Sequence, residues 1–304
     1  MENKAIEKYK KLINKYQISS DIDYVKAMYE LILYRTIDED ALIYWQDKIN
    51  KNEFNNFIFL NGLFSSIEYK MNVSNFNILV HLARKKWCGL INKFDFIFDI
   101  GGSSPNIAEG ALVELGYNYR PKELIIFDLP EEEQYWGKPK FSQDKEYCFK
   151  TNEGEQWTLR YEHGHIEDIE NYSILNNKKF DLIFMGQVIE HIIPEKLPLV
   201  LKWIRNHLKK DGRFIFDTPN RLITKLLNAN TYIDKDHKYE YTPNEIKKLL
   251  SKAGLKVIDH FGLLPMKYSY KNKIFDPLEV NESNLLSKET NKSYLFAFEC
   301  KAKL

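Results

Sequence analysis

The sequence has little of what marks several classes of protein. Its three cysteines, Cys88, Cys148 and Cys300, are widely spaced and odd in number, so they predict neither a disulfide framework nor a zinc knuckle. No apolar stretch approaches the roughly 20 residues that span a bilayer. Residues 1–4 lead straight into a charged segment, without the apolar core of a signal peptide. We therefore expect a cytoplasmic protein without a membrane span.

The chain also lacks an excess of charge of either sign. Its 304 residues contain 44 Lys and Arg against 43 Asp and Glu, and no basic stripe or acidic tail breaks this balance. Nucleic-acid-binding proteins usually carry clustered positive charge, so we expect no nucleic-acid partner. What the chain does have is 44% hydrophobic and 14% aromatic residues, which is enough for a well-filled core.

Residues 1–72 are predicted to form an all-α helical module. Apolar residues recur at helical spacing over residues 5–16, and a second helix is expected from Asp21, where Asp23 adds an acidic first turn. Two further helices are predicted at residues 40–49 and 54–64, and a polar connector is predicted at residues 71–77. The apolar stripes of these helices need a packing partner, so a small bundle is the simplest arrangement.

Residues 73–304 are predicted to form a second domain, in which strands alternate with helices. This pattern is typical of an α/β fold with a Rossmann-like, doubly wound and mostly parallel sheet. Seven strands are expected, at residues 94–100, 123–128, 156–161, 181–186, 213–216, 256–259 and 293–300. The fourth is apolar throughout after its first residue, which indicates a central position in the sheet.

In a sheet of this kind, ligands bind beside the first strand, where the strands end. That strand ends at Asp99 and continues into Gly101 and Gly102, which permit a tight turn and a close approach of the ligand. Asp128 ends the second strand, about where a carboxylate would bind a ribose diol through two hydrogen bonds. Further candidates follow the third and fourth strands, namely His165, Ile166 and Gln187.

A glycine-rich turn followed by an acid also occurs in nicotinamide enzymes. Their fingerprint Gly-x-Gly-x-x-Gly is missing here, because Ser103 and Asn106 stand where glycines are expected. A carboxylate at Asp99 also disfavours a pyrophosphate and favours a cationic ligand that carries an amino-acid group. A nicotinamide oxidoreductase therefore stays open only as a weaker alternative.

Five segments of the second domain occur in the order and spacing of one enzyme family. They are residues 94–102, 125–128, 180–192, 208–216 and the motif Thr218-Pro219-Asn220. With these segments, the second domain resembles the class I S-adenosylmethionine-dependent methyltransferases, in the group with a Thr-Pro-Asn motif after strand five. The resemblance implies S-adenosylmethionine as the cofactor and an antiparallel last strand. One departure is the glycine-rich turn, where only Gly101 of the family's Gly-x-Gly-x-Gly stays in register.

The resemblance also implies roles for individual residues around the cofactor. The methionine moiety is expected at Asp99, Gly101, Gly102 and the backbone near Ser103, the ribose at Asp128 beside Leu129, the adenine at His165 and Ile166, and the pocket wall at Gln187. The structural alternatives are a plain strand-to-helix turn and solvated surface turns. The two acids favour a ligand site, because a site that had lost its ligand would have no physical need for both.

Two histidines are candidate catalytic residues. His191 begins the helix after the fourth strand in the family's arrangement, and an imidazole can accept a hydroxyl proton near neutral pH. The resemblance places His237, in the loop before the next helix, as a substrate ligand or base. The structural alternatives are a helix start and a solvated charged loop. Asp234 and Asp236 beside His237 form a short, generic cluster, so we predict no metal site.

Residues 20–70 resemble a small bacterial helical domain of unknown function. The shared residues are Tyr29, Leu33, Arg35, Asp38, Leu42, Tyr44, Trp45 and Ser66-Ile67-Glu68-Tyr69. Such domains occur beside glycan-modifying enzymes, which suggests the pathway. The module is expected to pack and dock without chemistry of its own, and it could bind a partner protein or a second copy of the chain.

Together these features predict a methyltransferase that O-methylates a sugar hydroxyl of a bacterial surface glycan, a step in polysaccharide biosynthesis. The acceptor is inferred from the helical module and the Thr-Pro-Asn group, not from residue chemistry. One alternative is an O-methyltransferase of a small molecule or a lipid precursor. Another is a methyltransferase-like adaptor without activity. A DNA amino-methyltransferase is disfavoured, because its Asn/Asp-Pro-Pro-aromatic motif is absent after the fourth strand.

Overall fold

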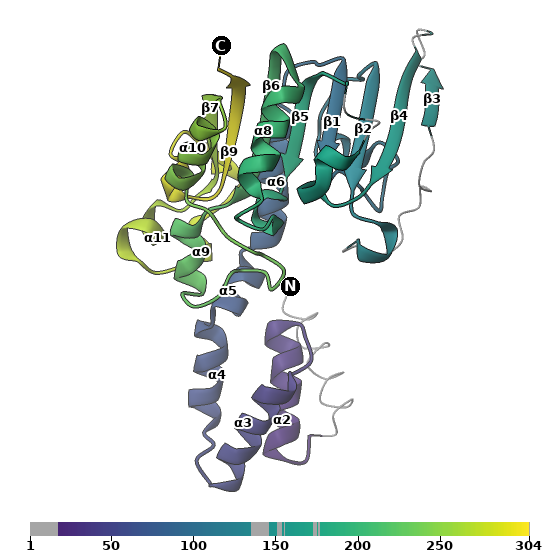
Figure 1. Cartoon of the computed structure of the whole chain (residues 1–304). Coiled ribbons are helices and arrows are strands. Elements are labelled where there is room, and N and C mark those ends of the chain that lie inside the picture. The colour runs from purple at the N-terminus through teal and green to yellow at the C-terminus, as the bar shows by residue number, and fades with distance from the viewer. Residues whose placement is uncertain are drawn as a thin grey trace. The chain divides into compact units, whose positions relative to one another are not determined.

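The computed structural model of the chain describes residues 18–134, 146–150, 154, 156–172, 175 and 177–303 (Figure 1). These residues divide into two compact units. The first unit comprises residues 18–76 with Asp276–Leu278, and the second comprises the described residues of 77–275 and 279–303. No helix in the described ranges is long and apolar enough to cross a membrane.

The first unit consists of helices, as predicted. They are α2 (Asp21–Met28), which continues as the π-helical turn η1 (Tyr29–Leu33), α3 (Glu39–Asn50), α4 (Asn56–Ser65) and α5 (Ile67–Val73). Each α-helix begins after a side chain that caps its free amides, namely Ser20, Asp38, Asn55 and Ser66. The connector predicted over residues 71–77 is wrong in its first part, because the Ser66 cap starts a helix that reaches Val73. The helix predicted over residues 5–16 lies outside the described residues.

The core of the first unit is aromatic. Phe59 is 1% exposed, and the rings that surround it are those of Tyr24, Tyr29, Trp45 and Phe54. Arg35 donates to both carboxylate oxygens of Glu68, at 2.6 and 3.1 Å, and so ties the corner before α3 to α5. Residues shared with the helical domain family therefore build the core and its corner.

In the described part of the second unit, nine strands form one sheet in the order β3-β4-β2-β1-β5-β6-β9-β7-β8 (Figure 1). The strands are β1 (Phe96–Ile100), β2 (Glu123–Asp128), β3 (Glu146–Lys150), β4 (Gln156–His163), β5 (Phe180–Gly186), β6 (Leu208–Pro219), β7 (Leu255–Pro265), β8 (Leu286–Ser287) and β9 (Ser293–Ala302). Neighbours from β4 to β6 are parallel, whereas β9 runs antiparallel to both β6 and β7. The predicted parallel sheet and its antiparallel last strand are confirmed.

Two edge strands were not predicted from the sequence. In β3 exposed residues alternate with half-buried ones, and the strand pairs antiparallel with β4. The strand β8 is only two residues long and pairs antiparallel with β7. The apolar run of β3 is only Tyr147-Cys148-Phe149, between charged residues, and β8 has a single apolar residue, so neither strand has a strong sequence signal.

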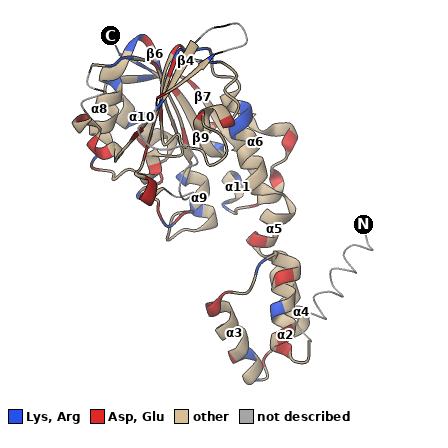
Figure 2. Ribbon diagram, turned by 90° about the vertical axis from the view of Figure 1, so that its right-hand side faces the viewer, with Lys and Arg blue, Asp and Glu red and all other residues tan. Residues whose placement is uncertain are grey.

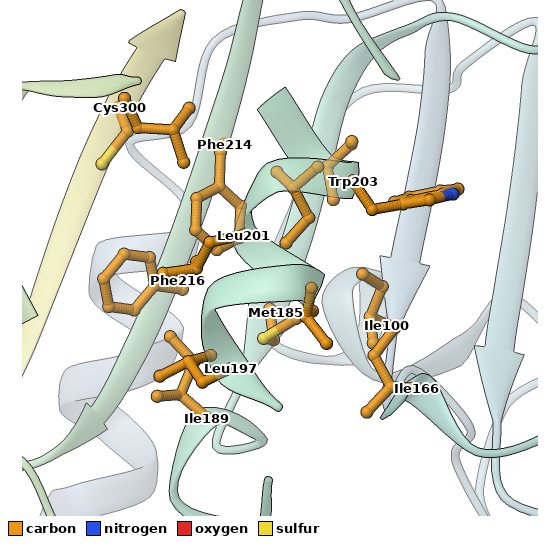
Figure 3. Close-up of a cluster of buried hydrophobic side chains, with 14 of the residues drawn as sticks. Ile100, Ile166, Met185, Ile189, Leu197, Leu201, Trp203, Phe214, Phe216 and Cys300 are labelled. Carbon is orange, nitrogen blue, oxygen red and sulfur yellow. The ribbon is translucent and has the colours of Figure 1, made fainter. Parts of the chain in front are cut away.

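Helices cover both faces of this sheet. The α-helices of this unit are α6 (Phe76–Cys88), α7 (Gly110–Glu114), α8 (Leu197–His207), α9 (Arg221–Leu227), α10 (Pro243–Lys252) and α11 (Lys267–Asn272). Figures 1 and 2 show α8 and α10 on one face and α6 on the other. In Figure 3, Leu201 and Trp203 of α8 lie over Met185 of β5 and Phe216 of β6, within one buried cluster. Trp87 of α6 contacts Phe184, which faces the opposite side of β5. Because β5 is covered on both faces, its sequence is an apolar run.

Candidate functional site

The carboxyl ends of the five parallel strands lie at one edge of the sheet, and the predicted site residues lie at or after these ends. The loop after β1 is packed against the loop after β5. Gly101 has a φ of 70°, and a Cβ atom there would lie 2.3 Å from Cγ2 of Val188. This contact joins the first predicted cofactor segment to the segment that leads to Glu190 and His191.

The end of β1 places a buried acid under the same loop. Asp99 is 1% exposed, and its carboxylate accepts a hydrogen bond from the Leu112 amide at 3.3 Å. A Cβ atom at Gly102 would lie 2.4 Å from this carboxylate, so the loop needs a glycine there. Burial raises the pKa of Asp99 to about 8, and the negative charge of Asp128 contributes in the same direction. A cation beside Asp99 would therefore favour its ionised form.

Asp128 at the end of β2 is hydrogen-bonded to the same loop. Its Oδ2 accepts from the Ser103 amide and its Oδ1 from the Leu129 amide, both at 2.8 Å. The Ser103 hydroxyl is buried and has no hydrogen-bond partner among the described residues. A buried hydroxyl of this kind is usually satisfied, and a polar ligand in the loop would provide the missing partner. The glycines, the buried acid and this hydroxyl fit the methionine end of S-adenosylmethionine.

The residues predicted to flank the adenine point in different directions. His165 is exposed, and its Nε2 lies 3.4 Å from a carboxylate oxygen of Glu133. Ile166 is 8% exposed and begins the short helix η3 (Ile166–Asn171) as part of the core. The Leu129 side chain is exposed, while its carbonyl accepts a hydrogen bond from Gln134 at 2.7 Å. An adenine contact at His165 and Ile166, and a cofactor contact at Leu129, stay predictions.

Gln187 adopts an unusual backbone conformation at the end of β5. Its φ is 59°, a left-handed conformation that costs energy in a residue with a side chain. Two hydrogen bonds to Asp217 hold it there, one from its amide to the carbonyl at 3.0 Å and one from Nε2 to the carboxylate at 2.7 Å. Arg84 of α6 pairs with the same fully buried carboxylate at 2.8 Å. Neither Arg84 nor Asp217 was predicted from the sequence, although an acid inside an apolar strand is a usable signal.

The Thr-Pro-Asn motif at the end of β6 has two structural functions. The Thr218 hydroxyl donates to Oε2 of Glu190 at 2.8 Å. The Asn220 side chain accepts from the Leu222 amide at 3.1 Å, which caps α9, and donates to the Ser293 carbonyl at 2.8 Å. The motif therefore connects β6 to the predicted catalytic segment and to the last strand.

The structure brings His191 and His237 together, although the chain between them includes β6. Their ring centroids lie 4.8 Å apart. The carbonyl of Glu190, in the short helix η5 (Ile189–His191), accepts from the amides of Lys238 and Tyr239 at 2.8 and 3.1 Å and so holds the two segments together. One ligand atom from each of Glu190, His191 and His237 lies within 4.8 Å of the others, a grouping that the sequence did not predict.

Burial and charge act differently on these titratable groups. Burial raises the pKa of Glu190 to about 7. Burial, together with the neighbouring His237, lowers the pKa of His191. Burial by itself would lower the pKa of His237 as well. The carboxylates of Glu240 and Glu190 have a larger, opposite effect, so the pKa of His237 is raised. Its Nδ1 lies 2.9 Å from Oε1 of Glu240, a residue that the sequence analysis did not single out.

A shallow cavity lies at the opposite edge of the sheet. Its lining includes Asp95, Arg120, Lys122 and Trp157, near the amino ends of β1, β2 and β4. None of the predicted site residues lines it. We therefore place the candidate site at the carboxyl edge, where the buried acids, the unpartnered hydroxyl and the paired histidines are found.

Substituting Gly101 by alanine tests the contact between the two loops. Gly101→Ala is expected to lower the free energy of unfolding by about 1–3 kcal/mol more than Gly154→Ala. Gly154 also has a positive φ, of 83°, but no described atom lies within 4 Å of its Cβ position. Adding Val188→Ala to Gly101→Ala should recover part of the loss in urea unfolding. Equal losses at the two glycines would contradict the packing described.

Among solved structures, similar chains are S-adenosylmethionine-dependent methyltransferases. The protein from Thermotoga maritima is 17% identical, with 77% of this chain and 92% of that chain covered and a TM-score of 0.46. The one from Archaeoglobus fulgidus is 16% identical, with 77% and 99% covered and a TM-score of 0.46. The one from Clostridium acetobutylicum is 18% identical, with 87% and 99% covered and a TM-score of 0.42. No curated protein matches the chain.

Two families match the sequence itself. Residues 6–73 match a domain of unknown function (DUF4214), in agreement with the helical module that was expected. Residues 90–260, more than half of the chain, match a family described as a methyltransferase domain. This match contains the loop after β1, the acid that ends β2 and the segment with both histidines. The chain therefore belongs to the class I S-adenosylmethionine-dependent methyltransferases, with S-adenosylmethionine as its cofactor.

Proposed function

We propose that the protein methylates a hydroxyl group on a sugar of a bacterial surface glycan. The cluster of Glu190, His191 and His237 is the observation that supports a hydroxyl acceptor, because its groups can accept the proton that the hydroxyl loses. The glycan is supported by the match of residues 6–73 to the domain expected beside glycan-modifying enzymes. That unit would dock a partner protein or a second copy of the chain.

The proposal assigns the cofactor to the loop after β1. S-adenosylmethionine supplies a methyl group activated by its sulfonium. Asp99 would stabilise the positive end of its methionine moiety, and the Ser103 hydroxyl would gain a hydrogen-bond partner. Asp128 would bind the ribose with the lone pairs that the loop amides leave free. The contact of Gly101 with Val188 supports an acceptor site beside this loop, since Val188 lies two residues before Glu190.

The acceptor end of the site would hold the hydroxyl beside the two imidazoles. Methyl transfer from a sulfonium depends mainly on positioning, and a hydroxyl acceptor must also lose its proton. His237 is oriented by Glu240, and His191 is the more readily neutral of the pair. We propose that the reaction takes place in the cytoplasm, in keeping with the free cysteines Cys88, Cys148 and Cys300.

The other acceptors and the adaptor hypothesis predict different outcomes. A small molecule or a lipid precursor with a hydroxyl would use the same cluster, so only an acceptor screen separates them from a glycan. An inactive adaptor would have no use for a buried acid such as Asp99, because burying a carboxyl group without a ligand is unfavourable. The unpartnered Ser103 hydroxyl also favours a site that still binds its ligand.

Transfer of labelled methyl groups tests the acceptor chemistry. The protein is incubated with methyl-labelled S-adenosylmethionine and separate panels of glycans, lipid-linked sugars and free sugars. We expect label on the glycans as a methyl ether, which survives mild base. His237→Ala should lower the turnover by about 10²–10⁴-fold while cofactor binding is retained. His81→Ala, at an exposed histidine of α6, is the control. Base-labile esters, N-linked label or equal rates in both variants would contradict the proposal.

Cofactor binding is also expected to release a proton from Asp99. With a pKa of about 8, its carboxyl group is protonated at pH 6.5, where an α-amino group is already charged. A cation bound beside Asp99 lowers this pKa, so binding should release up to one proton. Calorimetric titrations at pH 6.5 in buffers of different ionisation enthalpy measure the number of protons released per cofactor bound. Asp99→Asn should abolish the release, and wild-type heats that are independent of the buffer would contradict the assignment.

A further inference from the structure

We infer that Glu190, His191 and His237 bind a divalent transition-metal ion such as Zn²⁺ at the acceptor end of the site. The inference deepens the proposed function and rests on it for the role of the ion. Two imidazoles and one carboxylate are a donor set that zinc accepts in catalytic sites, where a further coordination position stays open. The sequence alone predicted no metal, because it did not bring the two histidines together.

The spacing of the ligand atoms is close to what one ion requires. Ligand atoms about 2.1 Å from a tetrahedral ion lie about 3.4 Å from each other. The candidate atoms of Glu190, His191 and His237 all lie within 4.8 Å of one another. Small side-chain rotations therefore suffice to bring the three atoms around one ion.

The carboxylate of Glu190 has an unsatisfied oxygen in this cluster. Glu190 is fully buried, and its Oε2 is held by Thr218 at 2.8 Å. Its Oε1 is buried and has no hydrogen-bond partner among the described residues. A buried carboxylate oxygen without a partner is unfavourable, and a cation between Glu190 and the histidines would satisfy it.

The imidazole of His237 is also held in the way that metal-binding histidines are. The second ring nitrogen of such a histidine is usually bonded to a carboxylate or a backbone carbonyl, which orients the ring. Nδ1 of His237 lies 2.9 Å from Oε1 of Glu240, and the ring of His191 lies beside that of His237, with their centroids 4.8 Å apart. In His237 this leaves Nε2 to bind an ion.

Glu240, the proposed outer-sphere partner, is itself held by several hydrogen bonds. Its side chain is fully buried and accepts hydrogen bonds from the Thr224 hydroxyl and from the Ile233 amide, the latter at 2.7 Å. The guanidinium of Arg221 lies 3.5 Å from its other oxygen. Glu240 is therefore a positioning residue, which would act on the ion through His237.

An ion in this place would have a defined use. With three protein ligands, it keeps an open position toward the acceptor hydroxyl, whose proton is lost more easily beside a divalent cation. The position is next to the cofactor loop, because Val188 packs against Gly101 two residues before Glu190. The competing explanation is a metal-free cluster in which a charged His237 lies between Glu190 and Glu240.

Titration with a metal alone separates these explanations. Tag-free, metal-stripped, full-length protein is titrated with Co²⁺, followed by visible absorption, and with Zn²⁺, followed by calorimetry. We expect one equivalent to bind. His237→Ala and Glu190→Gln should weaken binding by more than the 10–100-fold that a lost outer-sphere partner typically causes, and Glu240→Gln by about that factor. His81→Ala, at an exposed histidine, should bind as the wild type does.

S-adenosylmethionine binding by each variant serves as the test of correct folding. The inference is overturned if the wild type binds neither ion, or if binding survives both ligand substitutions in folded protein. Hydroxyl methylation in the presence of a chelator, by protein that binds no metal, would overturn the inference and leave the proposed function standing. Metal binding at the cluster without hydroxyl methylation would confirm the site and count against the proposed function.

Discussion

The rest of the site depends on the contacts that the buried carboxylate of Asp217 makes with its neighbours. Arg84 neutralises its charge from α6, and Gln187 binds both its carboxylate and its backbone carbonyl. These bonds hold Gln187 in a left-handed conformation and thereby set the course of the loop after β5. The residue that follows, Val188, then lies on Gly101. If either partner of Asp217 were removed, a buried charge or a strained turn would be left without support.

This arrangement couples the two halves of the proposed reaction. The loop after β1 holds the candidate cofactor residues, and the loop after β5 leads from its contact with Gly101 to Glu190 and His191. The segment around His237 is attached to the same place by backbone hydrogen bonds to the Glu190 carbonyl. A disturbance at the packing contact should therefore affect the cofactor and the acceptor ends together. Such coupling is useful in methyl transfer, where the relative positions of donor and acceptor decide the rate.

The sheet could be predicted from the sequence because its central strands are continuous apolar runs that end in recognisable residues. The edge strands β3 and β8 have at most short apolar runs, and Ser66 was noted only as part of a family motif and not as the cap of a helix. For the site, the residues at strand ends followed from chain order. The meeting of His191 with His237 did not, because it arises from hydrogen bonds between segments on either side of β6. Glu240 likewise becomes visible only once His237 is placed beside it.

The most direct test of the account is a calorimetric titration of the purified protein with S-adenosylmethionine, with NAD as the control ligand. We expect micromolar binding, about 8 kcal/mol, for S-adenosylmethionine and none for NAD. Asp128→Ala should abolish this binding, and Asp95→Ala, an acid near the opposite edge of the sheet, should leave it intact. Unchanged affinity in folded Asp128→Ala protein, or no binding by the wild type, would contradict the site at the carboxyl edge.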